Sequence, residues 1–341
     1  MNPDQRPQRL VQLDGLRGIA AFGVVAYHWP FFFNGPALLP FGYLFVDLFF
    51  LLSGFVLTPV VTKKVRDKYT PFDFLRDRVR RFWSVAAIGT LIGVAVLSTN
   101  PEFSGAWLKL ALGLAFIPAL FAHGPIFPLN VVQWSLFWEL VANYVHARWF
   151  ERCSDRMLIG IAAVFGALLA ASFITQGNGN LGAQSYDWYF AIPRFAFSYI
   201  TGILIARRFR GARVVPVQQW LPRLAIPLLA VAAIPLLGEK SSLGEVVVVL
   251  AIFPIGFSLL AQTTPDARFA RPLGYLGKLS FPLYAVHMPL FVCAQLISYS
   301  AQSGIVAVAF VTLCAALIAK WLEPGRIKPR ALEPTRLPSR T

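Results

Sequence analysis

Eleven apolar segments cover most of this chain, and most of the charged residues lie in the gaps between them or at the two ends of the chain. A helix that crosses a membrane needs about 20 consecutive, mostly apolar residues. The composition agrees, because 57% of the residues are hydrophobic and only 14% are charged. The sequence therefore predicts an all-α integral membrane protein. The segments are 16–34, 41–61, 82–98, 107–121, 131–150, 157–175, 188–206, 223–238, 245–262, 281–299 and 303–321.

The net charge of +15 would be typical of a nucleic-acid-binding protein if the basic residues were clustered on one surface. Here they gather in the gaps 62–81, 207–223 and 263–280 and at both ends of the chain. The gaps 176–187, 239–244 and 300–302 hold almost none. This is the positive-inside pattern, so the basic gaps are expected in the cytoplasm and the partner is a lipid bilayer, not a nucleic acid. We expect a multi-pass protein of the cytoplasmic (inner) membrane.

The charge pattern also predicts the number of spans. Eleven spans would place the two ends of the chain on opposite sides, and the basic gaps 62–81 and 207–223 would conflict as well. The segment 107–121 is short, contains Pro118 and precedes the Pro- and Gly-bearing stretch 123–128. We expect it to be a re-entrant or interfacial helix on the outer side, packed against protein. A bundle of about ten transmembrane helices follows, with both termini cytoplasmic.

One domain, residues 10–322, contains all these segments, and residues 323–341 form a short cytoplasmic tail. The tail is polar and has four prolines, so we expect it to be disordered. The first segment lacks an obvious small-x-small cleavage site and is expected to be retained. Three cysteines, Cys153, Cys293 and Cys314, show no paired spacing, which predicts neither a disulfide framework nor a metal site.

Arg17 and His28 lie inside the first apolar segment, eleven positions apart. In a helix they would share one face and be separated by about 16 Å along the axis. Ionisable groups at membrane depth are energetically unfavourable, and they usually face the protein interior or a water-filled cavity. This pair therefore indicates a site.

Other polar residues also fall within apolar segments: Asp47, Glu139, Arg194 and His287. Asn143 and His146 follow Glu139 at i+4 and i+7 on one helical face. Each has a structural alternative, since a membrane histidine or asparagine often only bonds a neighbouring helix. Arg194 would then neutralise a carboxylate, either Asp47 or Glu139. We expect His123 and His146 to be loop or boundary residues. Taken together, the set predicts a polar chamber.

The gap after the second segment carries Arg78 and Arg81, which share one face of a helix at i, i+3 spacing. Guanidinium groups suit phosphates because their planar N–H groups form bidentate, charge-assisted hydrogen bonds. Positive-inside charge with binding of lipid headgroups is the alternative explanation.

These motifs, in this order, resemble those of membrane-bound acyltransferase family 3. Asp14-Gly15-Leu16-Arg17 with His28 is similar to the opening arginine–histidine motif, and Arg78-x-x-Arg81 to the paired cytoplasmic arginines. The remaining matches are Val46–Phe50 with Leu52-Ser53-Gly54-Phe55, Trp134-Ser135-Leu136 with Glu139, and Gly277–Ser280 with Tyr284 and His287-Met288-Pro289. Two departures stand out: Ser84 occupies a position where the family often has proline, and Glu139 is the only acidic residue after Trp-Ser-Leu. The sequence also shows no SGNH domain.

The resemblance implies an O-acyltransferase that uses cytoplasmic acyl-CoA, most often acetyl-CoA, and no bound cofactor. The acceptor would be a hydroxyl of an extracytoplasmic carbohydrate. Arg17, Arg78 and Arg81 would bind the donor. His28 would act as general base or as acyl carrier, with Glu139 or Asp47 orienting it. Supporting or substrate-positioning roles would fall to Ser53, Trp134, Asn143, Arg194, Ser280, Tyr284 and His287.

Three alternatives stay open at this stage. A secondary transporter would also place polar residues near the midplane of about ten spans. A lipid-binding or assembly subunit would need no chemistry, and an acyltransferase with a small-molecule acceptor would need no carbohydrate. The outer loops 176–180 and 183–188 mix amides with aromatic rings, as carbohydrate sites do, but this is also ordinary loop composition. The oligomeric state is not predicted.

Overall fold

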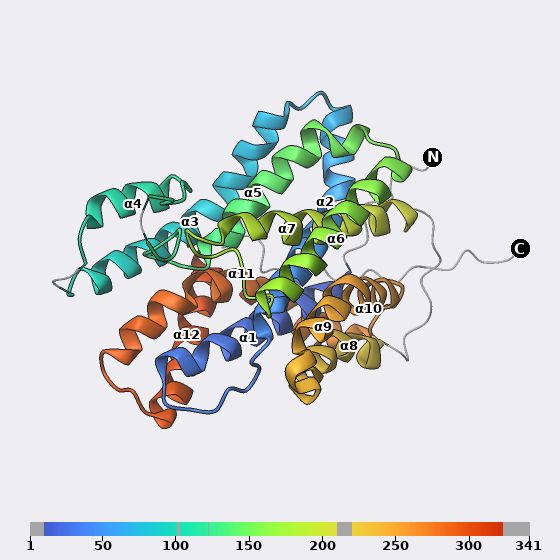
Figure 1. The fold of residues 1–341 in the computed structure, drawn as a ribbon. Helices are drawn as coiled ribbons and strands as arrows, with labels where there is room; N and C mark the ends of the chain where they lie inside the picture. Colours follow the sequence, from blue (N-terminus) through green and yellow to red (C-terminus); the bar gives the residue numbers. More distant parts are fainter. Residues whose placement is uncertain (1–9, 101–102, 122, 210–219, 323–341) are drawn as a thin grey trace, which may run out of the picture.

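A computed structural model describes residues 10–100, 103–121, 123–209 and 220–322, and its described residues form helices and no β-strand (Figure 1). A π-helical turn, Val248–Ile252, joins α9 to α10. The helices are α1 (Val11–Phe32), α2 (Phe45–Arg66), α3 (Pro71–Leu97), α4 (Ala106–Leu114), α5 (Gln133–Arg148), α6 (Asp155–Gln176), α7 (Ala191–Arg208), α8 (Trp220–Ala233), α9 (Ser241–Val247), α10 (Phe253–Ala261), α11 (Ala267–Gln295) and α12 (Ala301–Leu322).

The predicted helical membrane bundle is confirmed at this level. Within the described ranges, eight helical stretches are long and apolar enough to cross a membrane. They contain α2, α3, α6, α7, α8, the joined α9 and α10, α11 and α12. The 22-residue α1 and the 16-residue α5 are not among them. The total of ten spans and the side of each terminus stay predictions, and the tail 323–341 lies outside the described residues.

All eleven predicted segments coincide with helical stretches, but two helices begin well before the apolar residues do. The helix α3 begins at Pro71, not at 82, because Thr70 caps it. The Thr70 hydroxyl accepts from the Asp73 backbone N–H at 3.1 Å, and proline suits the first helical position. The helix α11 begins at Ala267, not at 281. The cap at Thr70 therefore extends α3 far enough to include Arg78 and Arg81, which lie on a helix as predicted.

The short fourth segment contains most of α4, a helix of only nine residues that folds back along α3. Its last carbonyl, that of Leu114, accepts from the indole N–H of Trp83 at 3.0 Å. The Gly113 carbonyl accepts from the Gln133 side chain at the start of α5, at 2.8 Å. Since Trp83 lies about 20 Å before the end of α3, α4 descends beside that helix before the chain returns. Figure 1 shows α4 at the periphery of the bundle.

Small residues bring two pairs of helices into close contact. A Cβ atom on Gly18 would lie 2.8 Å from the Leu276 carbonyl oxygen, where α1 packs on α11. One on Gly54 would lie 2.0 Å from the Tyr199 carbonyl oxygen, where α2 packs on α7. Such close approach of backbones is typical of helix pairs in membranes. The two pairs fix the side chains that surround the site, and α8, α9 and α10 group together at one side (Figure 1).

Candidate active site

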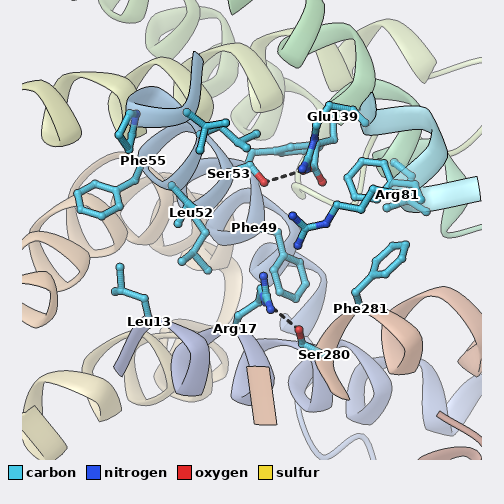
Figure 2. A pocket seen from close by; sticks show the side chains of 18 of the residues that line it. Leu13, Arg17, Phe49, Leu52, Ser53, Phe55, Arg81, Glu139, Ser280 and Phe281 are labelled. Carbon is cyan, nitrogen blue, oxygen red and sulfur yellow. Dashed lines mark hydrogen bonds and ion pairs between the residues drawn. The ribbon is translucent and has the colours of Figure 1, made fainter. Parts of the chain in front are cut away.

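A cavity of about 770 Å³ lies between α1, α2, α3, α5 and α11 (Figure 2). Along α2, its lining extends from Val46 to Lys64. The eighteen steps between these two residues correspond to about 27 Å of helix. Seven residues predicted from the sequence line it: Arg17, Ser53, Arg78, Arg81, Glu139, Ser280 and Tyr284. In Figure 2, Arg17 and Arg81 extend into the space between the walls.

The end of the cavity near the α2–α3 turn is basic. Lys63, Lys64, Arg78 and Arg81 line it, together with Tyr69. Most of these side chains are at least partly exposed, whereas Arg78 is buried. Lys64 pairs with Asp77, so it is partly neutralised. The lysines and Tyr69 were not among the predicted site residues, although they lie in the basic gap 62–81 that the charge pattern marked.

Arg78 is held in place by a carboxylate but keeps donors free. Its Nη2 lies 3.3 Å from Glu139 Oε1, which also accepts from the Ser53 hydroxyl at 2.8 Å. The guanidinium carbon lies 4.8 Å from the centre of the Phe82 ring. Its buried Nε has no hydrogen-bond partner among the described residues. A guanidinium has five N–H donors, so this one retains capacity for a ligand.

Arg17 joins α1 to α11 at the opposite wall. Its Nε donates to Ser280 Oγ at 2.8 Å and its Nη2 to the Gly277 carbonyl at 2.5 Å. Asp14, one turn earlier, lies 3.8 Å away. The two ends of the 277–280 motif, the Gly277 carbonyl and the Ser280 hydroxyl, thus both accept hydrogen bonds from this arginine.

The deep end of the cavity is mostly uncharged. The Tyr284 hydroxyl lies 2.6 Å from Ser135 Oγ, and both side chains are buried. The Phe49 ring packs edge-on against Tyr284, with centroids 5.5 Å apart. Ser135 was missed as a site residue, although it stands inside the Trp-Ser-Leu motif. Its position within that motif was the available signal.

His28 and His287 meet beside this deep end, but neither lines the cavity. His28 Nδ1 lies 3.0 Å from His287 Nε2, and His287 Nδ1 lies 2.8 Å from the Tyr284 carbonyl oxygen. The prediction that Glu139 or Asp47 orients His28 is therefore wrong, because the observed hydrogen-bond partner of His28 is His287. Among the described residues, each of these carboxylates pairs with an arginine and His28 pairs with a second histidine.

Asp47 and Arg194 form a fully buried ion pair away from the cavity. Arg194 Nη2 lies 2.6 Å from Asp47 Oδ2, and Nε lies 3.2 Å from Oδ1. Arg194 also donates to the Leu181 carbonyl at 2.6 Å. The buried Trp134 ring lies 5.5 Å from the guanidinium carbon. Of the two carboxylates considered for Arg194, the structure thus selects Asp47.

Asn143 belongs to a third polar cluster, also outside the cavity. Its Oδ1 accepts from the Tyr199 hydroxyl at 2.9 Å, and that hydroxyl lies 3.2 Å from His146 Nδ1. His146 lies in the last turn of α5, at a helix boundary as predicted, and its side chain is fully buried. Its imidazole fits there because the Tyr199 hydroxyl supplies a polar partner. His123 lies in an exposed loop, as expected.

Glu245 is a buried carboxylate that the sequence analysis did not single out. Its Oε2 accepts from the Tyr43 hydroxyl at 2.7 Å and from the Gly179 backbone N–H at 2.6 Å. It therefore ties α9 to the loop after α6. A carboxylate at the start of the apolar run 245–262 was a signal that could have identified it.

The described residues contain no group of three His, Cys, Asp or Glu side chains placed to hold a metal ion. The cavity offers cations and hydroxyl groups instead. Such a lining can bind a ligand that is anionic at one end and uncharged at the other.

Comparisons with known proteins agree on the family to which this chain is similar. A family model described as an acyltransferase domain matches residues 10–322. Protein 2 in the picA locus of Rhizobium radiobacter is 35% identical over 183 residues, which are 48% of this chain and 94% of the relative.

More distant relatives share a larger part of the chain. The exopolysaccharide production protein ExoZ of Rhizobium meliloti is 24% identical, covering 71% of this chain and 74% of its own. The O-acetyltransferase OatA of Staphylococcus aureus is 23% identical over 88% of this chain, which spans 53% of OatA. No solved structure matches the chain.

Proposed function

Because the chain belongs to the acyltransferase 3 family and is an O-acyltransferase, we propose that its donor is acetyl-CoA and its acceptor a carbohydrate hydroxyl. The acyl-CoA would enter from the cytoplasm, and the acceptor would be presented on the outer side of the inner membrane. The name of ExoZ, an exopolysaccharide production protein, supports a polysaccharide as acceptor, and the name of OatA, an O-acetyltransferase, supports acetyl as the transferred group. A small-molecule hydroxyl is the alternative.

The shape and charge of the cavity carry this proposal. CoA has phosphates at one end and an uncharged arm that ends in the thioester. The cavity has the same order, with Lys63, Arg78 and Arg81 at the exposed end and Phe49 and Tyr284 at the buried end. The phosphates would bind at the basic end, where charge-assisted hydrogen bonds are strong. The thioester would then lie next to Tyr284, close to the histidine pair.

In this scheme Arg17, Arg78 and Arg81 bind the donor, and neighbouring side chains hold two of these arginines in position. Glu139 and Ser53 fix Arg78, while Ser280 fixes Arg17. Glu139 is thereby assigned to donor positioning instead of to orienting His28. Asp47, Arg194, Trp134 and Asn143 are assigned to the fold, because they lie in buried clusters outside the cavity.

The chemistry is assigned to His28. As general base, it would take the proton of the acceptor hydroxyl while that oxygen attacks the thioester carbonyl carbon. The carbon–sulfur bond then breaks, the electron pair leaves with sulfur, and the proton passes to the CoA thiolate. As acyl carrier, the imidazole would first attack the thioester itself and afterwards deliver the acyl group to the hydroxyl. Both routes need one ring nitrogen of His28 with a free lone pair.

Binding of acetyl-CoA by the purified protein in proteoliposomes tests the donor assignment. The double variant Arg78→Ala/Arg81→Ala should raise the dissociation constant at least ~10-fold, because charged hydrogen bonds contribute about 1.5–3 kcal/mol each. Arg268→Ala/Arg271→Ala is the matched control, since both arginines are exposed and do not line the cavity. Unchanged affinity in the first variant would remove the arginines from the donor site.

Two further measurements test the reaction. Mass spectrometry of surface carbohydrate from a deletion strain should show the loss of one acetyl mass per modified sugar. His28→Ala should then fail to restore that mass at normal expression, whereas the wild-type chain restores it. A transporter would instead move solute into vesicles without consuming acetyl-CoA, and that result would replace the proposal.

A further inference from the structure

His28 and His287 are brought together from opposite ends of the chain, 259 positions apart. They lie on α1 and α11, whose backbones meet so closely at Gly18 that a side chain would not fit. The ring centroids are 5.0 Å apart, and Nδ1 of His28 lies 3.0 Å from Nε2 of His287. His287 is fully buried, while His28 is partly exposed. The geometry of this pair determines where the protons sit.

The proton on His287 follows from its backbone contact. Nδ1 of His287 lies 2.8 Å from the carbonyl oxygen of Tyr284, one turn earlier on α11. A carbonyl oxygen only accepts hydrogen bonds, so Nδ1 must carry the proton. In a neutral imidazole the other nitrogen is then an acceptor. Nε2 of His287 therefore presents a lone pair to His28.

The proton on His28 follows in turn. Because Nε2 of His287 accepts, Nδ1 of His28 must donate, and it carries the proton. Nε2 of His28 is left with the lone pair. Within the described part of the chain, no side chain hydrogen-bonds to that nitrogen.

We propose that His287 is a positioning residue that holds His28 as its Nδ1–H tautomer, so that Nε2 of His28 is the nitrogen that attacks or takes a proton. This rests on the proposed function of His28 in acyl transfer. The opposite tautomer would aim the only lone pair of His28 at His287, where no substrate can reach it. In serine hydrolases, an aspartate sets the histidine tautomer. Here a neutral ring does so, and no unpaired carboxylate has to be buried.

The hydrogen bond between the two histidines can also persist during the reaction. When Nε2 of His28 gains a proton or an acyl group, Nδ1 still carries its own proton and still donates to His287. The Nδ1–H to Nε2 hydrogen bond is thus retained in every state, and the ring keeps its orientation. The Tyr284 carbonyl keeps His287 from rotating.

Solid-state NMR of the full chain with ¹⁵N-labelled histidine in proteoliposomes tests the tautomers without any activity measurement. The chain has only four histidines, so single variants can assign each signal. We expect the wild-type His28 to show a protonated Nδ1 and an unprotonated Nε2. In His287→Phe this preference should be lost. A wild-type His28 that is protonated on Nε2 overturns the proposal.

Kinetics test the consequence for acyl transfer. His287→Phe should lower kcat by about 100- to 10,000-fold, the usual contribution of a general base, and leave the KM for acetyl-CoA unchanged because His287 does not line the cavity. His287→Gln supplies an oxygen that can accept from His28 and should recover at least ~10-fold of that loss. His146→Gln, at a buried histidine in another cluster, is the control and should keep the wild-type rate.

The outcomes separate the two hypotheses. Equal rates in His287→Phe and the wild type, with both proteins folded by size-exclusion chromatography, overturn the positioning role. A His28→Ala protein with full activity overturns the proposed function, yet the NMR spectrum still reports whether His287 sets the tautomer. If His287→Phe does not fold, the wild-type spectrum and His287→Gln decide the question.

Discussion

The Asp47–Arg194 ion pair offers a direct test of our assignments. The sequence analysis assigned Asp47 to catalysis, whereas the structure places it in a buried ion pair. We predict that removing either charge destabilises the bundle and that removing both largely restores it. The two side chains are 0% and 1% exposed, so neither charge reaches solvent. Asp47→Leu leaves the guanidinium with two carbonyl partners, those of Leu181 and Tyr43, for its five donors.

The magnitude follows from this burial. Breaking a buried ion pair by removing one partner costs about 3–5 kcal/mol, because an uncompensated charge remains. Replacing both partners with apolar side chains is often close to neutral. We therefore expect Asp47→Leu and Arg194→Met each to lower the free energy of unfolding by about 3–5 kcal/mol. The double variant should recover at least ~2 kcal/mol relative to either single variant.

Reversible unfolding in mixed micelles, with an increasing fraction of denaturing detergent, measures the free-energy cycle. The control is Asp155→Asn at the pair between Asp155 and Arg207, where the Asp155 side chain is 61% exposed. That change should cost no more than about 1 kcal/mol. Acyl transfer by the stabilised double variant is the decisive second measurement. If Asp47 acts only in the fold, activity returns together with stability.

Two results would refute this reasoning. Additive losses in the double variant would mean that the two charges do not compensate each other. A double variant that is stable but inactive would mean that Asp47 or Arg194 takes part in the reaction.

Further predictions concern the helix contacts and the cavity. Gly54→Leu should abolish folded protein in a size-exclusion assay, because even a Cβ would collide with the α7 backbone, whereas Gly160→Ala meets no atom within 4 Å and should be tolerated. Arg17→Lys should raise the KM for acetyl-CoA at least ~10-fold, since lysine cannot reproduce two directed contacts to α11; an unchanged KM contradicts this role. Ser53→Ala removes one hydrogen bond to Glu139 and should weaken acetyl-CoA binding by about fivefold, measured by titration.

The sequence predicted the helices better than their ends. Apolar runs identify residues that prefer a membrane, and each predicted segment contains a helix, although residues 115–121 of the fourth segment are not helical. An apolar run does not show whether the polar residues before it are also helical. For this reason α3 and α11 begin earlier than the apolar runs that predicted them. At α3 the start depends on the Thr70 cap, which a hydropathy pattern does not register.

The sequence identified many of the individual polar residues, but it did not predict which of them pair with each other. Asp47, Glu139 and Arg194 were singled out because charge at membrane depth is rare, and Arg78 because it pairs with Arg81 at i, i+3 spacing in a basic gap. Which carboxylate meets which arginine depends on how α2, α3, α5 and α7 pack, and that is not encoded in local spacing. His28 was expected to meet a carboxylate because triads usually contain one.

The close contacts of α1 with α11 and of α2 with α7 have a mechanical consequence. Backbones that touch at glycine cannot slide past each other without collision, so each pair moves as one rigid body. Arg17 and the histidine pair belong to the first body, and Ser53 to the second. The cavity lies between these two bodies, and α3 and α5 complete its wall. A change in the distance between Arg17 and Ser53 therefore requires a displacement of one whole body against the other.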